Sequence, residues 1–302
     1  MASPAADRLA RLADEPLRDI NPASGFWSGA GRNLVEIWRR RELVRFLFQR
    51  EIRSRYKDSA LGVVWSLIRP IVTLLVYYLV IGAFIGARRA IPDFAVYVYI
   101  GLTLWGLFNE SVTFGTASVV ANAGIIKKIH LPREVFPLAS VGSALFNFGV
   151  QCVILLAAVF VLGGGVNPSG LGYVPLGVLV VLVWGTALAI LLSALNVYLR
   201  DVQFLVEVAL MVGFWASPIV YSWKQVAESL VNHPWVAEVY ASNPVTLAVF
   251  GLQRALWSGG VDMPCPSHLA ARLLIVLAVG LVALFLAQRV FDRLQRDFAQ
   301  EL

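Results

Sequence analysis

The chain has 302 residues, of which 58% are hydrophobic and only 15% charged, and its formal net charge is +6. This composition is too apolar for a soluble globular protein and predicts a polytopic membrane protein of the all-α class. Most of the basic residues stand just outside long apolar blocks, which favours the membrane interface over a surface that binds nucleic acid.

The first part of the chain is polar. Residues 1–33 mix proline, alanine, glycine and charges without a helical period, which predicts a loosely ordered tail. No secretory signal precedes the first apolar block, so we expect this tail in the cytoplasm. Residues 34–60 predict an amphipathic helix in the membrane interface. Arg41 and Arg55 interrupt its apolar stripe, and they could bind lipid phosphates or simply reach ordinary headgroups.

Six apolar blocks follow, and each approaches or exceeds the about 20 residues that a helix needs to cross a bilayer. They lie at roughly 62–86, 94–117, 136–162, 171–198, 204–222 and 268–288. Six spans place both termini on one side, and the excess of lysine and arginine there predicts that this side is the cytoplasm. We therefore expect a transmembrane domain at 61–290 and a cytoplasmic tail at 291–302.

Two connecting segments are more than turns. On the inner side, 118–131 predicts a short amphipathic helix with isoleucines on one face and Lys127 and Lys128 on another. Such a helix suits a docking element, although an interfacial helix that docks nothing has the same pattern. On the outer side, 223–256 is aromatic and apolar, which predicts short helices that dip back toward the membrane.

Arg69 and Glu110 are ionisable residues inside predicted spans, where each costs at least a few kcal/mol unless it is paired or hydrated. Arg69 lies about 10 Å deep in the first span, and Glu110 reaches a similar depth in the second, which runs the other way. We hypothesise that the two form an ion pair near the inner third of the membrane. The alternative is that each side chain reaches water or headgroups separately.

Aromatic residues crowd the early spans and the outer segment. An interfacial belt explains many of them, whereas a sharper hypothesis is that some line a passage and stack on sugar rings. The candidates for a channel lining are Tyr77, Tyr97, Tyr99, Trp105, Phe108, Phe214, Trp215 and Tyr221.

The sequence carries no nucleotide-binding motif and no pattern typical of a metal site or a hydrolytic triad. It has no Gly-x-x-x-x-Gly-Lys-Ser/Thr nucleotide motif, and its three histidines share no helix face with a second metal ligand. We expect no metal site and no cofactor on this chain.

Four stretches, in this order, carry a family resemblance. They are Arg53–Pro70 (RSRYKDSALGVVWSLIRP), Asn122–Pro137 (NAGIIKKIHLPREVFP), Asn196–Val202 (NVYLRDV) and Ser217–Tyr221 (SPIVY) followed by Asn243-Pro244. Together they resemble the ABC-2 type permease subunits of polysaccharide exporters, the Wzm-like and teichoic-acid exporter group. The resemblance covers about 35–290, and the composition suggests a high-GC organism, for which a cell-wall galactan is as plausible a cargo as an O-antigen.

The resemblance implies a homodimer with six spans per subunit, paired with two copies of a separate ATPase subunit that holds ATP and Mg²⁺. It makes 118–131 a coupling helix that docks on the ATPase, and 223–256 the gate helices at the outer exit. The coupling residues would be Asn122, Ile125, Lys127, Lys128, His130, Arg133 and Glu134. The residues placed to meet a lipid-linked diphosphate at the entrance would be Arg41, Arg53, Arg55 and Lys57.

The prediction is therefore a transport subunit in the cytoplasmic membrane, without catalytic activity of its own, that moves polyprenyl-diphosphate-linked polysaccharide outward. Export of a smaller lipid or drug is the near alternative. A proton-coupled transporter would use Glu110 and Glu207, but Glu207 begins a span near the boundary. A membrane glycosyltransferase would need more inner-loop carboxylates than Glu134 and Asp201.

Overall fold

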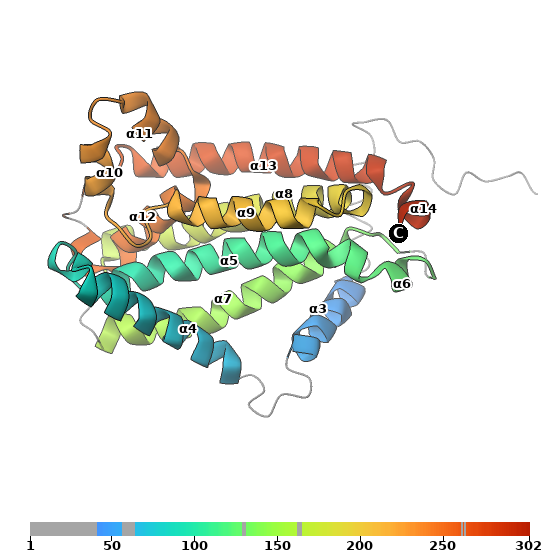
Figure 1. Cartoon of the computed structure of the whole chain (residues 1–302), viewed down its shortest axis with the longest axis horizontal. Helices are drawn as coiled ribbons and strands as arrows, with labels where there is room; N and C mark the ends of the chain where they lie inside the picture. The colour runs from blue at the N-terminus through green and yellow to red at the C-terminus, as the bar shows by residue number, and fades with distance from the viewer. Residues whose placement is uncertain (1–40, 56–63, 129–130, 162–164, 261, 263) are drawn as a thin grey trace, which may run out of the picture. The chain divides into compact units, whose positions relative to one another are not determined.

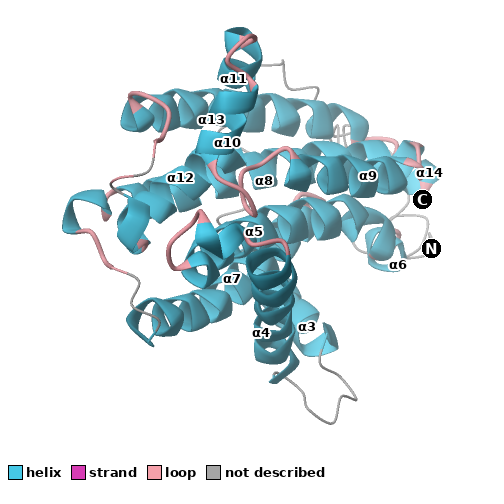
Figure 2. Ribbon diagram, turned by 60° about the vertical axis from the view of Figure 1, so that its left-hand side comes forward, coloured by secondary structure: helices cyan, strands magenta, loops and turns pink. Residues whose placement is uncertain are grey.

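The computed structural model describes residues 41–55, 64–128, 131–161, 165–260, 262 and 264–302. The chain divides into two compact units, Met1–Trp38 and Arg39–Leu302, and all described residues belong to the second. Their regular structure is entirely helical (Figures 1 and 2), which confirms the all-α prediction for this part of the chain. The predicted tail at 1–33 lies outside the described residues, as do Lys57 and His130.

Helix α5 (Phe94–Ala121) is one of the two central helices of the described structure. It contacts both α7 (Val135–Val161) and α8 (Tyr173–Tyr198), and in Figure 1 it runs alongside them. Its contact with α8 is close because both helices carry small residues there, and Gly115 lies against Ala189. Small side chains let helix backbones approach closely, as is common between helices in membranes.

Among the described residues, four helical segments are long and apolar enough to cross a membrane, and each corresponds to a predicted span. They are Trp65–Phe84, Val135–Val161, Pro168–Tyr198 and Leu269–Leu294. α5 has 28 residues and therefore the necessary length, but it is not one of these four segments, and it carries Asn109 and Glu110 near its middle.

The first of these segments consists of α4 (Trp65–Tyr77) and a π-helix that continues it, Tyr78–Phe84. No side chain of α4 is buried within the chain. Much of its apolar surface, including Val72 and Leu75, is exposed and therefore faces lipid or another protein.

The block predicted as a span at 204–222 forms a shorter helix, α9 (Val202–Trp215). Its 14 residues extend about 21 Å, less than the about 30 Å of a bilayer core. Pro218 explains where the helix stops, because the residue before a proline avoids the helical conformation. Helix length alone therefore supports fewer than six spans, and the count of six stays a prediction.

The outer segment predicted at 223–256 contains three helices, α10 (Trp223–Ser229), α11 (Pro234–Ala241) and α12 (Pro244–Leu256). Ser222 caps α10 through a capping box, and Asn243 caps α12. α12 is buried along nearly its whole length and contacts α8, whereas α10 has no buried residue. The helices are thus as predicted, and whether they enter the membrane stays a prediction.

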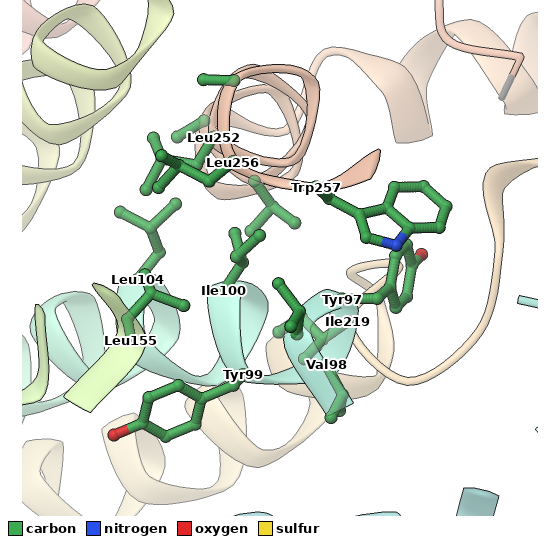
Figure 3. Packing of buried hydrophobic residues seen from close by; sticks show 14 of the residues in the cluster. Tyr97, Val98, Tyr99, Ile100, Leu104, Leu155, Ile219, Leu252, Leu256 and Trp257 are labelled. Carbon is green, nitrogen blue, oxygen red and sulfur yellow. The ribbon is translucent and has the colours of Figure 1, made fainter. Parts of the chain in front are cut away.

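Two clusters of buried hydrophobic residues position the candidate sites. The first joins the N-terminal half of α5 to α12 and to the turn after α9; in Figure 3, Tyr97 and Trp257 lie together, with ring centroids 5.0 Å apart. The second cluster gathers the C-terminal half of α5, the start of α7 and the ends of α8 and α13 (Leu269–Leu294).

Helix α3 (Arg41–Arg55) is the described part of the amphipathic helix predicted at 34–60. It buries Leu47 in the second cluster, and the ring of Phe48 meets Phe146 of α7 with centroids 6.4 Å apart. The helix is thus packed onto α7 through its apolar side.

The C-terminal residues are packed too, although the sequence predicted only a tail at 291–302. α13 continues to Leu294, a short helix α14 (Phe298–Glu301) follows, and Phe291 and Phe298 are fully buried in the second cluster. A tail with two buried aromatic rings is part of the fold.

Candidate transport and coupling sites

The segment predicted as one helix over 118–131 contains a turn. Asn122 leaves the helical conformation at the end of α5, and α6 (Ala123–Ile126) adds only four residues. The amide nitrogen of Asn122 donates to the Ser118 carbonyl at 2.8 Å, and its amide oxygen accepts a hydrogen bond from Arg50 of α3. Asparagine side chains compete with helical backbone bonds, which explains the break.

The short helix α6 is apolar, and a turn with two lysines follows it. Ile126 is buried in the second cluster and Ile125 packs against it, whereas Lys127 and Lys128 are exposed. The apolar residues fix the helix to the rest of the chain, and the two ammonium groups are available to an acidic partner surface. Both features suit a docking element.

A buried polar cluster joins this segment to the C-terminal end of the chain. The Glu134 side chain is only 3% exposed, and it accepts a hydrogen bond from Gln295 at 3.2 Å. Gln295 also donates to Asp292 at 3.1 Å, and Asp292 forms an ion pair with Arg289 at 3.1 Å. Buried networks of this kind make a junction rigid. Glu134, predicted as a docking residue, is therefore an internal anchor in this chain.

Arg133 is held beside the same cluster. Its guanidinium lies 5.5 Å from the ring centroid of Phe298, in the geometry of a cation–π contact. The Phe298 ring in turn meets Phe291 and Tyr198, with centroids 5.5 and 6.0 Å away. The end of the coupling segment thus rests on the C-terminal residues.

The sequence analysis did not find Arg289, Asp292, Gln295 or Phe298. The signal available was the pair of opposite charges three positions apart, Arg289 and Asp292, at the end of the last apolar block. Such a pair is common at exposed helix ends, so the pattern does not predict that the Arg289 side chain is 4% exposed.

Replacing Glu134 with glutamine should change how stability depends on pH. Burial raises the pKa of Glu134 to about 8, and the neighbouring Asp292 adds to the shift. The folded chain then holds this proton to higher pH than the unfolded chain does, so the free energy of unfolding falls as the pH rises from about 4.5 to about 8. Glu134→Gln has no proton to lose. We expect its thermal unfolding midpoint to equal that of the wild type at acidic pH and to exceed it above about pH 8.

The control for this variant is Glu228→Gln, which removes an exposed carboxylate paired with Lys224 in α10. That variant should follow the wild-type pH profile. If Glu134→Gln and the wild type lost stability in parallel as the pH rose, the buried carboxyl would not carry the protonation change.

The predicted entrance residues are not brought together by α3. Arg41 and Arg53 are both exposed, but they lie twelve positions apart, which is about 18 Å along the helix axis. Arg55 is the last residue of the helix, and Lys57 lies outside the described residues. One phosphate group therefore cannot contact both Arg41 and Arg53, and of the predicted entrance residues only Arg53 and Arg55 are neighbours in the described part of the helix.

Five of the predicted channel aromatics form a continuous row across α4, α5 and α9. Phe214 is its centre, with ring centroids 6.1 Å from Tyr77, 5.7 Å from Trp105 and 5.5 Å from Trp215, and Trp105 continues to Phe108 at 5.7 Å. Trp215 is 55% exposed at one end of the row. A molecule that moved along this side of the chain could contact the exposed end of the row.

The other three predicted channel residues, Tyr97, Tyr99 and Tyr221, are not part of this row. Tyr97 is buried, and its hydroxyl donates to the backbone carbonyl of Tyr221 at 2.8 Å. The Tyr221 hydroxyl bonds the Tyr240 hydroxyl at 2.6 Å, which links the turn after α9 to α11. Both residues therefore hold the fold together. Tyr99 is also almost fully buried, but it reaches the wall of a large cavity.

That cavity has a volume of about 820 Å³ and lies between α4, α5 and α7. Arg69 of α4 and Glu110 of α5 both line it. Glu110 accepts a hydrogen bond from Asn147 of α7 at 2.6 Å. A direct ion pair between Arg69 and Glu110 stays a prediction.

Comparisons with known proteins bear on this arrangement. Residues 42–257, from α3 to the end of α12, match the ABC-2 type transporter family. This chain belongs to that family. The ABC-2 chain is also 28% identical, over 90% of its length and 99% of the relative's, to the O-antigen export system permease protein RfbA of Myxococcus xanthus. It is 27% identical to a protein of the same name from Klebsiella pneumoniae, over 86% of its length and 95% of the relative's.

The family assignment confirms the resemblance inferred from the four stretches. It makes the ABC-2 chain a membrane protein with a transport role rather than a catalytic one, in agreement with its apolar helices. The match ends at Trp257, so α13, α14 and the residues that hold Glu134 lie beyond it.

Proposed function

We propose that this chain is the transmembrane subunit of an ATP-driven exporter that moves polyprenyl-diphosphate-linked polysaccharide outward across the cytoplasmic membrane. The observation that carries the proposal is the combination of the ABC-2 match with relatives named as O-antigen export permeases, aligned over most of both chains. The cargo is a hydroxyl-rich polymer, such as an O-antigen, a teichoic acid or a galactan.

The ATPase is a separate subunit that binds ATP and Mg²⁺ and docks on the segment around α6. The exposed Lys127 and Lys128 support this role because they directly follow a helix that is packed against the second cluster. Arg133 contacts Phe298, and Glu134 accepts a hydrogen bond from Gln295. These contacts give the segment a rigid connection to the end of α13, so that movement at the docked surface reaches the transmembrane helices.

Two copies of the chain form the transport unit, with the passage beside the aromatic row of α4, α5 and α9. The exposed apolar surfaces of α4 and α9 support this arrangement, since they face either lipid or a second copy. Each copy has six spans and both termini in the cytoplasm. In this topology α9 and the turn that follows it form the fifth span, and α10 to α12 are re-entrant helices at the outer exit.

Depletion of the chain tests the proposal. We expect undecorated cell surfaces and a build-up of lipid-linked polysaccharide on the cytoplasmic side, measured by extracting lipid-linked glycans before and after depletion. Export of a smaller lipid or drug would leave the glycan pool unchanged, and this result would overturn the polysaccharide assignment. A second check is whether a Walker-motif ATPase co-purifies with the chain from native membranes.

A further inference from the structure

Three helices turn polar faces toward the cavity of about 820 Å³. On α4, Ser66, Arg69 and Thr73 recur at helical spacing, and on α7 Asn147 and Gln151 stand four positions apart. Residues three or four positions apart share one face of a helix. The polar residues are therefore arranged toward the cavity, within helices that are otherwise apolar.

Polar side chains at membrane depth are costly unless they meet polar partners. Three carboxamides, a carboxylate, a guanidinium and several hydroxyls line one space here, and Asn147 donates a hydrogen bond to Glu110. A cavity of this volume falls within the about 300–1,000 Å³ typical of small-molecule sites. The space is therefore suited to polar contents.

The charges that line the cavity indicate whether its ligand is anionic or neutral. Among the described residues that line the cavity, Arg69 is the only cation and Glu110 the only anion. A diphosphate would require an excess of positive charge, as in sites built from several arginines or lysines. A neutral ligand that both donates and accepts hydrogen bonds suits the carboxamides and hydroxyls better, and the ring of Trp65, which is 49% exposed, offers an apolar plane to C–H faces.

We propose that this cavity is a binding site for neutral sugar residues of the cargo, separate from the part of the chain that meets the diphosphate. The proposal rests on the proposed function, since it assigns a position to the glycan that the exporter moves. It places sugar contacts on α7, whose residues are not among the aromatic row.

Photo-crosslinking in cells that make the native glycan tests the site. Thr73 lines the cavity, whereas the adjacent Val72 of α4 is 51% exposed and does not. The full chain would carry p-benzoylphenylalanine at one position or the other, and adducts would be analysed for lipid and, after periodate oxidation, for sugar. We expect sugar adducts from position 73 at least about fivefold above those from position 72. Lipid adducts without sugar at position 73, or equal sugar labelling at both positions, would overturn the proposal.

A matched pair of point variants gives an independent readout. Thr113→Val removes a hydroxyl from the cavity wall, whereas Thr116→Val, on the same helix, removes a hydroxyl that donates within its own helix to the Val112 carbonyl, 2.7 Å away. We expect Thr113→Val to slow the appearance of pulse-labelled glycan at the cell surface about threefold to tenfold, the loss of one hydrogen bond, and Thr116→Val to leave it unchanged. Equal rates in the two variants would contradict the site.

The outcomes separate this inference from the proposed function. If depletion causes lipid-linked glycan to accumulate but position 73 gives no sugar adduct, the chain exports polysaccharide by a route that avoids the cavity. If depletion causes no accumulation of lipid-linked glycan, the proposed function is overturned, and with it the assignment of the cavity to sugar residues.

Discussion

Gly115→Leu is expected to lower the free energy of unfolding by about 3 kcal/mol or more, since overpacking of this kind typically costs 1–3 kcal/mol and here the backbones must also separate. A side-chain carbon at position 115 would overlap the Cβ of Ala189 and lie 3.0 Å from its Cα. The contact between α5 and α8 is the most extensive in the described structure, so a displacement there affects the whole fold. We expect little folded protein in detergent extracts and a much lower thermal midpoint.

Gly149→Leu is the matched control for this change. Gly149 lies within α7, and no atom comes within 4 Å of the position that its Cβ would take. Leucine is a better helix former than glycine, so this variant should match or exceed the wild type in stability. Equal losses in the two variants would show that any leucine at a helical glycine is harmful, and that the close approach of α5 and α8 is not the cause.

The apolar spans were predictable because hydropathy depends only on a continuous run of residues in the sequence, and not on which residues pack against them in the fold. The predicted 62–86 and 136–162 correspond to Trp65–Phe84 and Val135–Val161 within a few positions. The same reasoning overextended the block at 204–222, because valine and isoleucine after Pro218 are apolar without being helical. It also ended the last span at 288, whereas buried Phe291 carries α13 onward.

Counting residues along the spans can compare the depths of two side chains in the membrane. It cannot predict which residues of different helices are in contact. Arg69 and Glu110 were placed together by counting residues from the ends of spans, and both line one cavity. Glu134 and Gln295 are 161 positions apart in the sequence, and a helical period reports which face of a helix a residue is on without naming the helix it meets. The same limit assigned Tyr97 to a passage, although its contacts with Trp257 and Tyr221 make it part of the core.

Phe298→Ala should both destabilise the chain and loosen the coupling segment. Truncating a fully buried phenylalanine costs about 3–5 kcal/mol, and Phe298 has no exposed surface. Its loss also removes the ring beneath Arg133, so the segment that begins at α6 loses a support from the C-terminal end. We expect a lower thermal midpoint and faster tryptic cleavage after the exposed Lys127 and Lys128 at temperatures well below that midpoint.

Two controls separate the local effect from the global one. Phe46→Ala truncates the same kind of side chain on α3, where it is 64% exposed, and should change neither the midpoint nor the cleavage rate by much. Arg133→Ala removes the cation while leaving Phe298 packed against Phe291 and Tyr198, so it should raise the cleavage rate with a smaller loss of stability. If Phe298→Ala lowered the midpoint but left cleavage at Lys127 and Lys128 unchanged, the C-terminal residues would stabilise the end of α13 without holding the coupling segment. The path from that segment to the transmembrane helices would then run through Arg50, Asn122 and α5.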